Sequence, residues 1–290
     1  GDGAGNVLNN PIGIAVDTTG NVYVPGLFSD NAFQITPAGV ITEIIDATGD
    51  GAGNGLIGSF LIAVDAAGNA YLTGQFSHNA FKITPAGVVT EIIDSHGDGA
   101  NPLTTPFGIA VDAAGNAYVA GGDSDNAFKI TPAKVITEII DAGGDGAGNT
   151  LNAARGIAVD AAGNVYVAGF ISDNAFKITP AGVITEIIDA TGDGAGNVLN
   201  GTEDVRVDAA GNVYLSGEFS DNAFKITPAC PGDANGDGTV DPLDSGFVLA
   251  RFGCDVGTGD PDCDAADQNG DGAVDPLDSG FVLARFGECS

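Results

Sequence analysis

Short runs of apolar residues alternate with polar turns through the first 229 residues, and the pattern repeats every 47 to 48 residues. In the first repeat, β-branched and aromatic residues concentrate in four runs, at 12–16, 21–24, 32–36 and 40–45. Such runs, bounded by turn residues, are typical of β-strands. No segment of the repeat has the 3.6-residue periodicity of a helix. The sequence therefore predicts four antiparallel strands per repeat.

The residues between the runs have the chemistry of tight turns. An Asp-Ala-Ala-Gly-Asn group after the first run combines a side-chain acceptor with a glycine suited to positive φ. A Ser-Asp-Asn group follows the second run, and Thr-Pro-Ala-Gly follows the third, where the proline lies outside the strand ladder. Repeats of this length with four strands each are typical of the blades of a β-propeller.

The fourth strand occurs one time fewer than the other three. It begins at Val40, Val88, Val135 and Val183, and after Ala229 the sequence changes character where a fifth copy is expected. We therefore expect a five-bladed β-propeller over residues 1–229, with about 48 residues per blade. Its fifth blade lacks its own outer strand, and an unpaired edge is a ready site for strand addition.

One strand of each repeat carries a family signature. It reads GNVYV, GNAYL, GNAYV, GNVYV and GNVYL in the five copies. In this respect the sequence resembles the bacterial repeat propellers of the NHL and SBBP kinds over residues 1–229. The resemblance implies the fold but no particular function, because such propellers include enzymes, ligand binders and scaffolds.

Charged residues break the repeat in the first strand of the fourth and fifth blades. Arg155 and Glu203 occupy one repeat position in adjacent blades, Asp204 replaces a glycine or leucine, and Arg206 replaces an alanine. These four residues predict either a polar rim that binds a ligand at the channel mouth or ion pairs that join neighbouring blades, and the second interpretation is favoured.

The repeat offers no pair of nucleophile and general base. It has no cysteine and no G-x-S-x-G motif, and its serines lie mainly in the Ser-Asp-Asn turns. Its two histidines, His78 and His96, lie in predicted turns, where we interpret them as solvated residues. The sequence therefore predicts a protein that is not an enzyme.

The chain has a formal net charge of -30. Such an excess of carboxylates disfavours nucleic acid and anionic membranes as partners and favours cations. The loops between blades space Asp46, Asp50 and Asn54 as in part of a calcium loop, although no carboxylate follows at the twelfth position. They are either further calcium sites or ordinary glycine-rich loops. The related residues of the other loops are Asp94, Asp98, Asp141, Asp145, Asn149, Asp189, Asp193 and Asn197.

Residues 230–290 form a second predicted domain with two calcium loops. DANGDGTVDPLD at 233–244 and DQNGDGAVDPLD at 267–278 match the loop pattern of EF-hand-type sites, in which six to eight oxygens surround the ion. We expect two Ca²⁺ ions. The predicted ligands are Asp233, Asn235, Asp237, Thr239, Asp241 and Asp244, and Asp267, Asn269, Asp271, Ala273, Asp275 and Asp278.

Each loop is followed by PLDSGFVLARFG, which predicts a short amphipathic helix with proline near its start. Two such loop–helix halves with Asp at the twelfth position resemble a type I dockerin. The resemblance implies binding of a cohesin or a related protein partner. Pro242-Leu243 and Pro276-Leu277 replace the small polar residues common at these loop positions, a departure that concerns the partner rather than the ion.

All four cysteines lie in this second domain, which favours disulfides and a location outside the cytoplasm over a zinc site. Of the three possible pairings, we favour Cys230 with Cys289 and Cys254 with Cys263. The sequence has no apolar run long enough to span a membrane and no signal-like leader, so a secreted protein whose signal has been removed is expected.

These features together predict a secreted structural or adhesive protein. The C-terminal module and the open blade edge would join it to a protein partner or to copies of itself, head to tail, in an extracellular fibre or surface layer. The alternative is a carbohydrate- or peptide-binding propeller anchored to a cohesin-like partner. A propeller lyase or hydrolase is the least favoured interpretation.

Overall fold

The computed structural model describes residues 1–227, 242–254, 261–268 and 273–283. The chain divides into two compact units, Gly1–Ile226 and Thr227–Ser290. We call the first the repeat unit and the second the C-terminal unit. No helix in the described ranges is long and apolar enough to cross a membrane.

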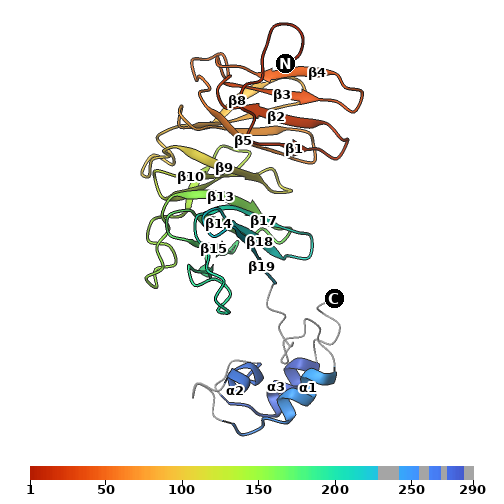
Figure 1. Ribbon diagram of the computed structural model, residues 1–290, viewed down its shortest axis with the longest axis vertical. Coiled ribbons are helices and arrows are strands. Elements are labelled where there is room, and N and C mark those ends of the chain that lie inside the picture. The colour runs from red at the N-terminus through yellow and green to blue at the C-terminus, as the bar shows by residue number, and fades with distance from the viewer. Residues whose placement is uncertain (228–241, 255–260, 269–272, 284–290) are drawn as a thin grey trace. The chain divides into compact units, whose positions relative to one another are not determined.

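The repeat unit consists of five antiparallel sheets in which consecutive strands are neighbours (Figure 1). Four sheets have four strands and the fifth has three. The first comprises β1 (Ala15–Val16), β2 (Val22–Gly26), β3 (Asn31–Ile35) and β4 (Ile41–Ile45). The second comprises β5 (Ser59–Val64), β6 (Ala70–Gly74), β7 (Asn79–Ile83) and β8 (Val89–Ile93). The third comprises β9 (Pro106–Val111), β10 (Ala117–Gly121), β11 (Asn126–Ile130) and β12 (Ile136–Ile140). The fourth comprises β13 (Ala154–Val159), β14 (Val165–Gly169), β15 (Asn174–Ile178) and β16 (Ile184–Ile188), and the fifth β17 (Thr202–Val207), β18 (Val213–Gly217) and β19 (Asn222–Ile226).

An aspartate closes the first hairpin of every sheet. In the third sheet, Asp112 accepts hydrogen bonds from the backbone and side chain of Asn116 at 2.8 and 2.7 Å and from the Tyr118 hydroxyl at 3.0 Å. Gly115 takes a φ of +80°, as the turn requires. Burial favours the protonated form of Asp112, but these hydrogen bonds outweigh it and lower the pKa of the carboxyl.

The second hairpin of each complete sheet reaches into the sheet that follows it. Asp125, at a φ of +52°, accepts a hydrogen bond from the backbone N–H of Ala153 at 2.7 Å. In the second sheet His78 takes this place, and its Nδ1 accepts from the N–H of Thr105 at 2.9 Å. His78 is therefore half-buried and bonded between sheets, rather than a solvated turn residue as predicted.

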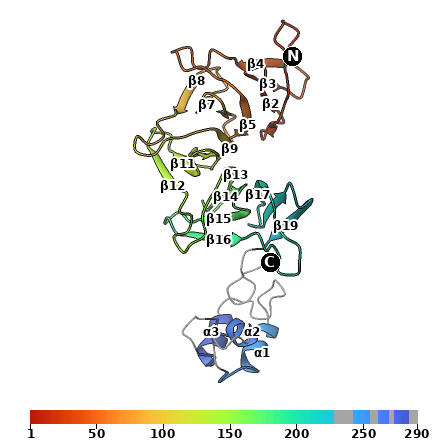
Figure 2. The same cartoon turned by 60° about the vertical axis from the view of Figure 1, so that its left-hand side comes forward.

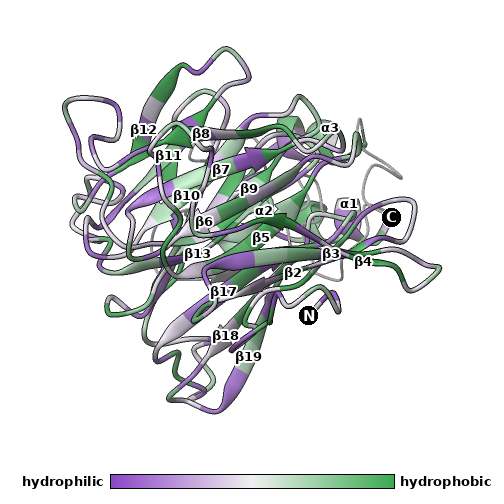
Figure 3. Cartoon of the chain, turned by 90° about the horizontal axis from the view of Figure 1, so that it is seen from above, coloured by the Kyte–Doolittle hydropathy of each residue, from purple (hydrophilic) through white to green (hydrophobic). Residues whose placement is uncertain are grey.

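The cores of the repeat unit lie between neighbouring sheets. Tyr118 of the third sheet packs with Ile157 and Phe176 of the fourth, and equivalent residues form the other three boundaries. Figure 3 shows hydrophobic residues mainly along the strands and hydrophilic residues mainly in the loops. One repeat thus supplies one face to each of its two neighbours, which accounts for the strict periodicity of the sequence.

The two end sheets leave these faces uncovered. Ile14 of the first sheet is 68% exposed, whereas Ile109 at the same repeat position is 4% exposed. Tyr214 of the fifth sheet is 41% exposed, whereas Tyr118 is 2% exposed. The first and fifth sheets lie at opposite ends of the row in Figures 1 and 2. The five predicted groups of strands are confirmed, but a closed five-bladed propeller is not.

The C-terminal unit contains three short helices, α1 (Pro242–Leu249), α2 (Pro261–Ala266) and α3 (Pro276–Leu283). Helices α1 and α3 contact one another, and Val248, Ala266, Val274 and Val282 form a small buried core. Each of the two longer helices begins at a proline. The fixed φ of proline suits the first helical position, and its lack of an N–H costs no hydrogen bond there, because the first N–H groups of a helix have no intrahelical partner.

Candidate functional site

The described part of the C-terminal unit includes Asp244, Asp267, Ala273, Asp275 and Asp278 of the predicted calcium ligands. The remaining predicted ligands, Asp233, Asn235, Asp237, Thr239, Asp241, Asn269 and Asp271, lie outside the described residues. The complete ligand sets therefore stay predictions, and the described part of the candidate site lies chiefly at the start of α1 and α3.

Asp244 and Asp278, the predicted closing ligands of the two loops, are both 0% exposed. Each is the third residue of its helix. Burial of a carboxylate is strongly unfavourable unless hydrogen bonds or a cation compensate its charge. Two fully buried aspartates at equivalent loop positions are therefore what two calcium-binding loops require of their last ligand.

The second loop shows how the helix start holds its carboxylate. Asp278 accepts a hydrogen bond from the backbone N–H of Asp275 at 2.8 Å, and Asp275 accepts one from the N–H of Leu277 at 2.7 Å. These bonds use N–H groups that a helix start leaves without intrahelical partners. Asp278 and Asp275 are thereby fixed next to one another, and calcium bound there would be held by oxygens of known orientation.

The helices have the same eight-residue sequence and bury the same positions, namely an aspartate, a serine and a valine. Their leucines remain on the surface: Leu243, Leu249, Leu277 and Leu283 are 53–66% exposed. Duplicate exposed leucines on paired helices give the C-terminal unit an apolar surface suited to a protein partner.

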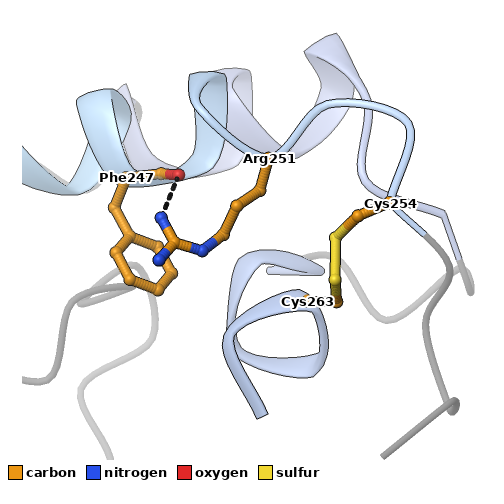
Figure 4. The surroundings of a disulfide bond; sticks show 4 residues. All are labelled: Phe247, Arg251, Cys254 and Cys263. Atoms are coloured by element: carbon orange, nitrogen blue, oxygen red, sulfur yellow. Dashed lines mark hydrogen bonds between the residues drawn. A yellow bond between two sulfur atoms is a disulfide. The ribbon is translucent and has the colours of Figure 1, made fainter. Parts of the chain in front are cut away.

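The disulfide between Cys254 and Cys263 is present, as predicted (Figure 4). It ties the segment after α1 to α2, beside Arg251, whose guanidinium lies 3.6 Å from the centre of the Phe247 ring and donates to the Phe247 carbonyl at 3.2 Å. The other predicted pair, Cys230 with Cys289, lies outside the described residues.

The structure brings the charged residues of the predicted rim together in two pairs. Arg155 on β13 forms an ion pair with Glu203 on β17, across the boundary between the fourth and fifth sheets. Arg206 Nε lies 2.9 Å from Asp204 Oδ2 on the same strand. Partial burial raises the pKa of Asp204, and Arg206 opposes this shift.

Two phenylalanines complete the surroundings of Arg155. Its guanidinium lies 3.4 Å from the centre of the Phe170 ring and 5.0 Å from that of Phe107. The sequence interpretation missed both rings. Phe107 was detectable, because it occupies the same repeat position as Arg155, whereas Phe170 is irregular in the repeat and gave no signal.

In the loops between sheets, the aspartate carboxylates accept hydrogen bonds from residues of the same loop. Asp193 accepts hydrogen bonds from the backbone N–H of Ala195 at 2.9 Å and from the side chain of Asn197 at 2.5 Å. Asp189 accepts from the backbone and hydroxyl of Thr191. Within the described ranges, no group of three or more His, Cys, Asp or Glu residues is placed to hold a metal ion.

Several solved structures share the fold of the repeat unit. A streptogramin B lyase is 17% identical with a TM-score of 0.58, and the match covers 76% of this chain and 66% of the lyase. A structure from a nidogen/laminin complex is 19% identical over 75% of each chain, with a TM-score of 0.55. A gluconolactonase-like protein is 13% identical, with coverage of 77% of this chain and 80% of that one and a TM-score of 0.52. No curated protein matches the chain by sequence.

These structures correct one prediction. Two of them carry the names of enzymes, so a fold of this kind does not exclude catalysis, and the prediction that the chain is not an enzyme is wrong as an inference from its architecture. At such low identity the likeness shows the fold alone.

The C-terminal unit matches a protein family directly, over residues 231–286. Domains of this family bind calcium and cohesin partners, which agrees with the buried Asp244 and Asp278. The match gives no support to the predicted self-assembly into a fibre. Residues 231–286 of this chain are a dockerin type I domain.

Proposed function

We propose that this protein is an extracellular component that its dockerin domain attaches to a cohesin-type partner, with the repeat unit as the part displayed. The proposal rests chiefly on the duplicated halves of residues 231–286, each with a helix whose third residue is a fully buried aspartate. A duplicated calcium-held scaffold that exposes apolar helix surface serves recognition of a protein rather than of a small molecule.

Calcium organises the recognition surface in this proposal. One ion in each loop, two in all, would be held by the ligand sets predicted from the sequence, with Asp244 and Asp278 as the closing carboxylates. Because such ligands are brought together only in the folded unit, ion binding contributes directly to the folding free energy. Removal of calcium should therefore abolish partner binding together with the fold of α1 and α3.

The exposed leucines of α1 and α3 supply the apolar contact. Leu249 and Leu283 are 53% and 55% exposed at the ends of the two helices, and apolar anchors of this kind carry much of the energy of a protein interface. Pro242 and Pro276, which precede the exposed Leu243 and Leu277, distinguish this surface chemically from one with small polar residues. We expect selectivity among cohesins to depend on these positions.

The disulfide between Cys254 and Cys263 supports the proposed location outside the cytoplasm, since such bonds persist in oxidising compartments. The dockerin assignment agrees with this location, because its partners act at surfaces and in extracellular assemblies.

A binding assay with immobilised cohesin domains tests the proposal. The full chain should bind at least one cohesin in millimolar calcium and release it in excess chelator. The variant Leu249→Asp/Leu283→Asp should lose binding, whereas Val40→Asp, at a site 57% exposed in the repeat unit, should bind as the parent does. Binding that survives chelation, or equal loss in both variants, would contradict the proposal.

A further inference from the structure

A three-residue network ties the second hairpin to the outer strand in each complete sheet. In the fourth sheet the Ser172 hydroxyl donates to Asn174 Oδ1 at 2.7 Å, and Asn174 Nδ2 donates to Glu186 Oε1 at 2.8 Å. The other complete sheets repeat these bonds with Ser29, Asn31 and Glu43, with Ser77, Asn79 and Glu91, and with Ser124, Asn126 and Glu138.

The fifth sheet contains this network without its glutamate. Ser220 donates to Asn222 Oδ1 at 2.7 Å, and Asn222 Nδ2 donates to the Val198 carbonyl at 2.8 Å. Both bonds have counterparts in the complete sheets. Among the described residues, no strand pairs with the outer edge of β19, so the place that Glu186 fills in the fourth sheet has no counterpart.

Loss of the outer strand also uncovers the side chains beside it. Asn174 is 3% exposed and Phe176 is 0% exposed in the fourth sheet, whereas Asn222 and Phe224 are only half-buried. Ala223 is exposed, although its equivalents in all four complete sheets are fully buried. The edge of β19 therefore presents both unpaired backbone and apolar side chains.

The outer strand always pairs in one register. Phe128 lies opposite Glu138 and Ile130 opposite Ile136 in the third sheet, and Phe176 opposite Glu186 and Ile178 opposite Ile184 in the fourth. The strand that receives it reads NAFKI in β7, β11, β15 and β19 alike. Strands β7, β11 and β15 have the same sequence as β19 and each pairs with an outer strand. Their outer strands therefore define the chemistry of a strand that would pair with β19.

We propose that the edge of β19 binds, in antiparallel orientation, an extended segment of a partner polypeptide that reads Ile-Thr-Glu-Ile-Ile. Its glutamate lies opposite Phe224 and accepts a hydrogen bond from Asn222 Nδ2, and its first isoleucine lies opposite Ile226. The four strands of this type in the sequence, β4, β8, β12 and β16, are each paired within their own sheet, so none of them is free to fill this edge. This site is independent of the dockerin domain and of its calcium.

The register makes the recognition selective. An acidic chain repels acidic peptides in general, so a glutamate is tolerated only where a hydrogen-bond donor such as Asn222 Nδ2 meets it. The backbone of an edge strand supplies affinity, and the alternating side chains supply specificity. A segment shifted by one residue would turn its isoleucines away from Phe224 and expose them.

Titration of the full chain with a synthetic peptide tests the proposal. The peptide AGVITEIIDA, with the sequence of residues 181–190, should protect from hydrogen exchange those amides of 222–226 that face the open edge of β19. Replacement of its glutamate by alanine should weaken binding about tenfold, the usual scale for a hydrogen bond to a charged group. A peptide of the same composition in scrambled order should not bind.

A variant of the protein completes the test. Asn222→Ala should weaken binding of the parent peptide about tenfold. It should not change binding of the peptide whose glutamate is replaced by alanine, because both changes remove the same hydrogen bond. Asn200→Ala, at an exposed asparagine in the loop before β17, is the matched control and should bind normally. Equal affinity of the two peptides for the parent chain would overturn the proposal without relying on any variant. So would an edge already protected before peptide is added.

Discussion

Arg155 of the fourth sheet forms an ion pair with Glu203 of the fifth sheet, at a repeat position that is apolar in the first three sheets. The side chains are 25% and 37% exposed, and the guanidinium also stacks on Phe170. Neighbouring sheets are otherwise joined by repeated apolar contacts and by the hydrogen bonds of the second hairpins. Among the described residues, this is the sheet boundary that an ion pair crosses.

Removal of Arg155 should destabilise the repeat unit more than removal of Glu203. Glu203→Gln breaks only a partly exposed ion pair and should lower the free energy of unfolding by less than about 1 kcal/mol. Arg155→Ala also removes the stacked guanidinium and should cost about 1–3 kcal/mol. Urea unfolding of each variant measures the difference. Arg206→Ala, which breaks the pair within β17, is the control and should have little effect.

Because the face of the first sheet is uncovered, replacing isoleucine by alanine at one repeat position should lower the free energy of unfolding less in the first sheet than in the third. Ile109→Ala removes a side chain that is 4% exposed and should cost about 2–4 kcal/mol of unfolding free energy. Ile14→Ala, where the side chain is 68% exposed, should cost less than about 0.5 kcal/mol. A similar loss in both variants would mean that another polypeptide segment covers the first sheet in solution.

The sequence predicted the strands because the first three strands of the repeat recur five times, and the outer strand four times, with the same pattern and the same turn residues. Asp112 and Gly115 occupy a turn whose chemistry is local, and local chemistry can be read from a sequence. Closure of the sheets into a ring cannot be read from the sequence, because it depends on how Ile14 and Tyr214 are placed across the whole row of sheets. The repeat describes only how each sheet meets the next.

The candidate site divides in the same way. The loop pattern in the sequence predicts Asp278 as a calcium ligand. The structure shows that its carboxylate is fully buried at the start of α3, and its role as a ligand stays a prediction. The stacking of Phe170 on Arg155 was not predictable, because Phe170 stands at an irregular position and its contact depends on the sheet boundary. The loss of burial at Asn222 was predictable in part. A missing outer strand is visible in the sequence, but the hydrogen bond that it leaves unmade is visible only in the structure.

The third sheet contains two carboxyl groups that should respond oppositely to pH. Burial, together with Asp141 and Asp98, raises the pKa of Glu138, so its ionised form destabilises the sheet as pH rises through that pKa. Glu138→Gln keeps the acceptor for Asn126 and should raise stability at pH 7. The gain should vanish below about pH 4, where the carboxyl of the parent is protonated in both states.

The contribution of Asp112 to stability should change with pH in the opposite direction, because its hydrogen bonds lower its pKa despite burial. Its contribution is present above about pH 4 and is lost as pH falls through the lowered pKa. Asp112→Asn should therefore cost about 1–3 kcal/mol at pH 7 and progressively less in acid. Urea unfolding of both variants at several pH values checks the pair. Parallel pH profiles would contradict the assignment of opposite shifts.

Calcium should stabilise the C-terminal unit alone. Chelation should lower its melting temperature and its helical signal, while the sheets of the repeat unit melt unchanged, because the buried Asp244 and Asp278 lose the cation that compensates their charge. Calorimetric titration of the parent should give two ions per chain, and Asp278→Asn should give one. The carboxamide keeps the size of the side chain but lacks the charge that the ion requires.

Asp193→Asn provides the control for this titration, since it alters a loop between sheets in the same way. Asp193 is held by Ala195 and Asn197 of its own loop, so the number of ions should stay at two. A fall in that number would assign calcium to the loops of the repeat unit as well. If Asp278→Asn instead bound calcium as the parent does, the closing ligand would have to be another residue, and the buried carboxylates at the helix starts would serve packing alone.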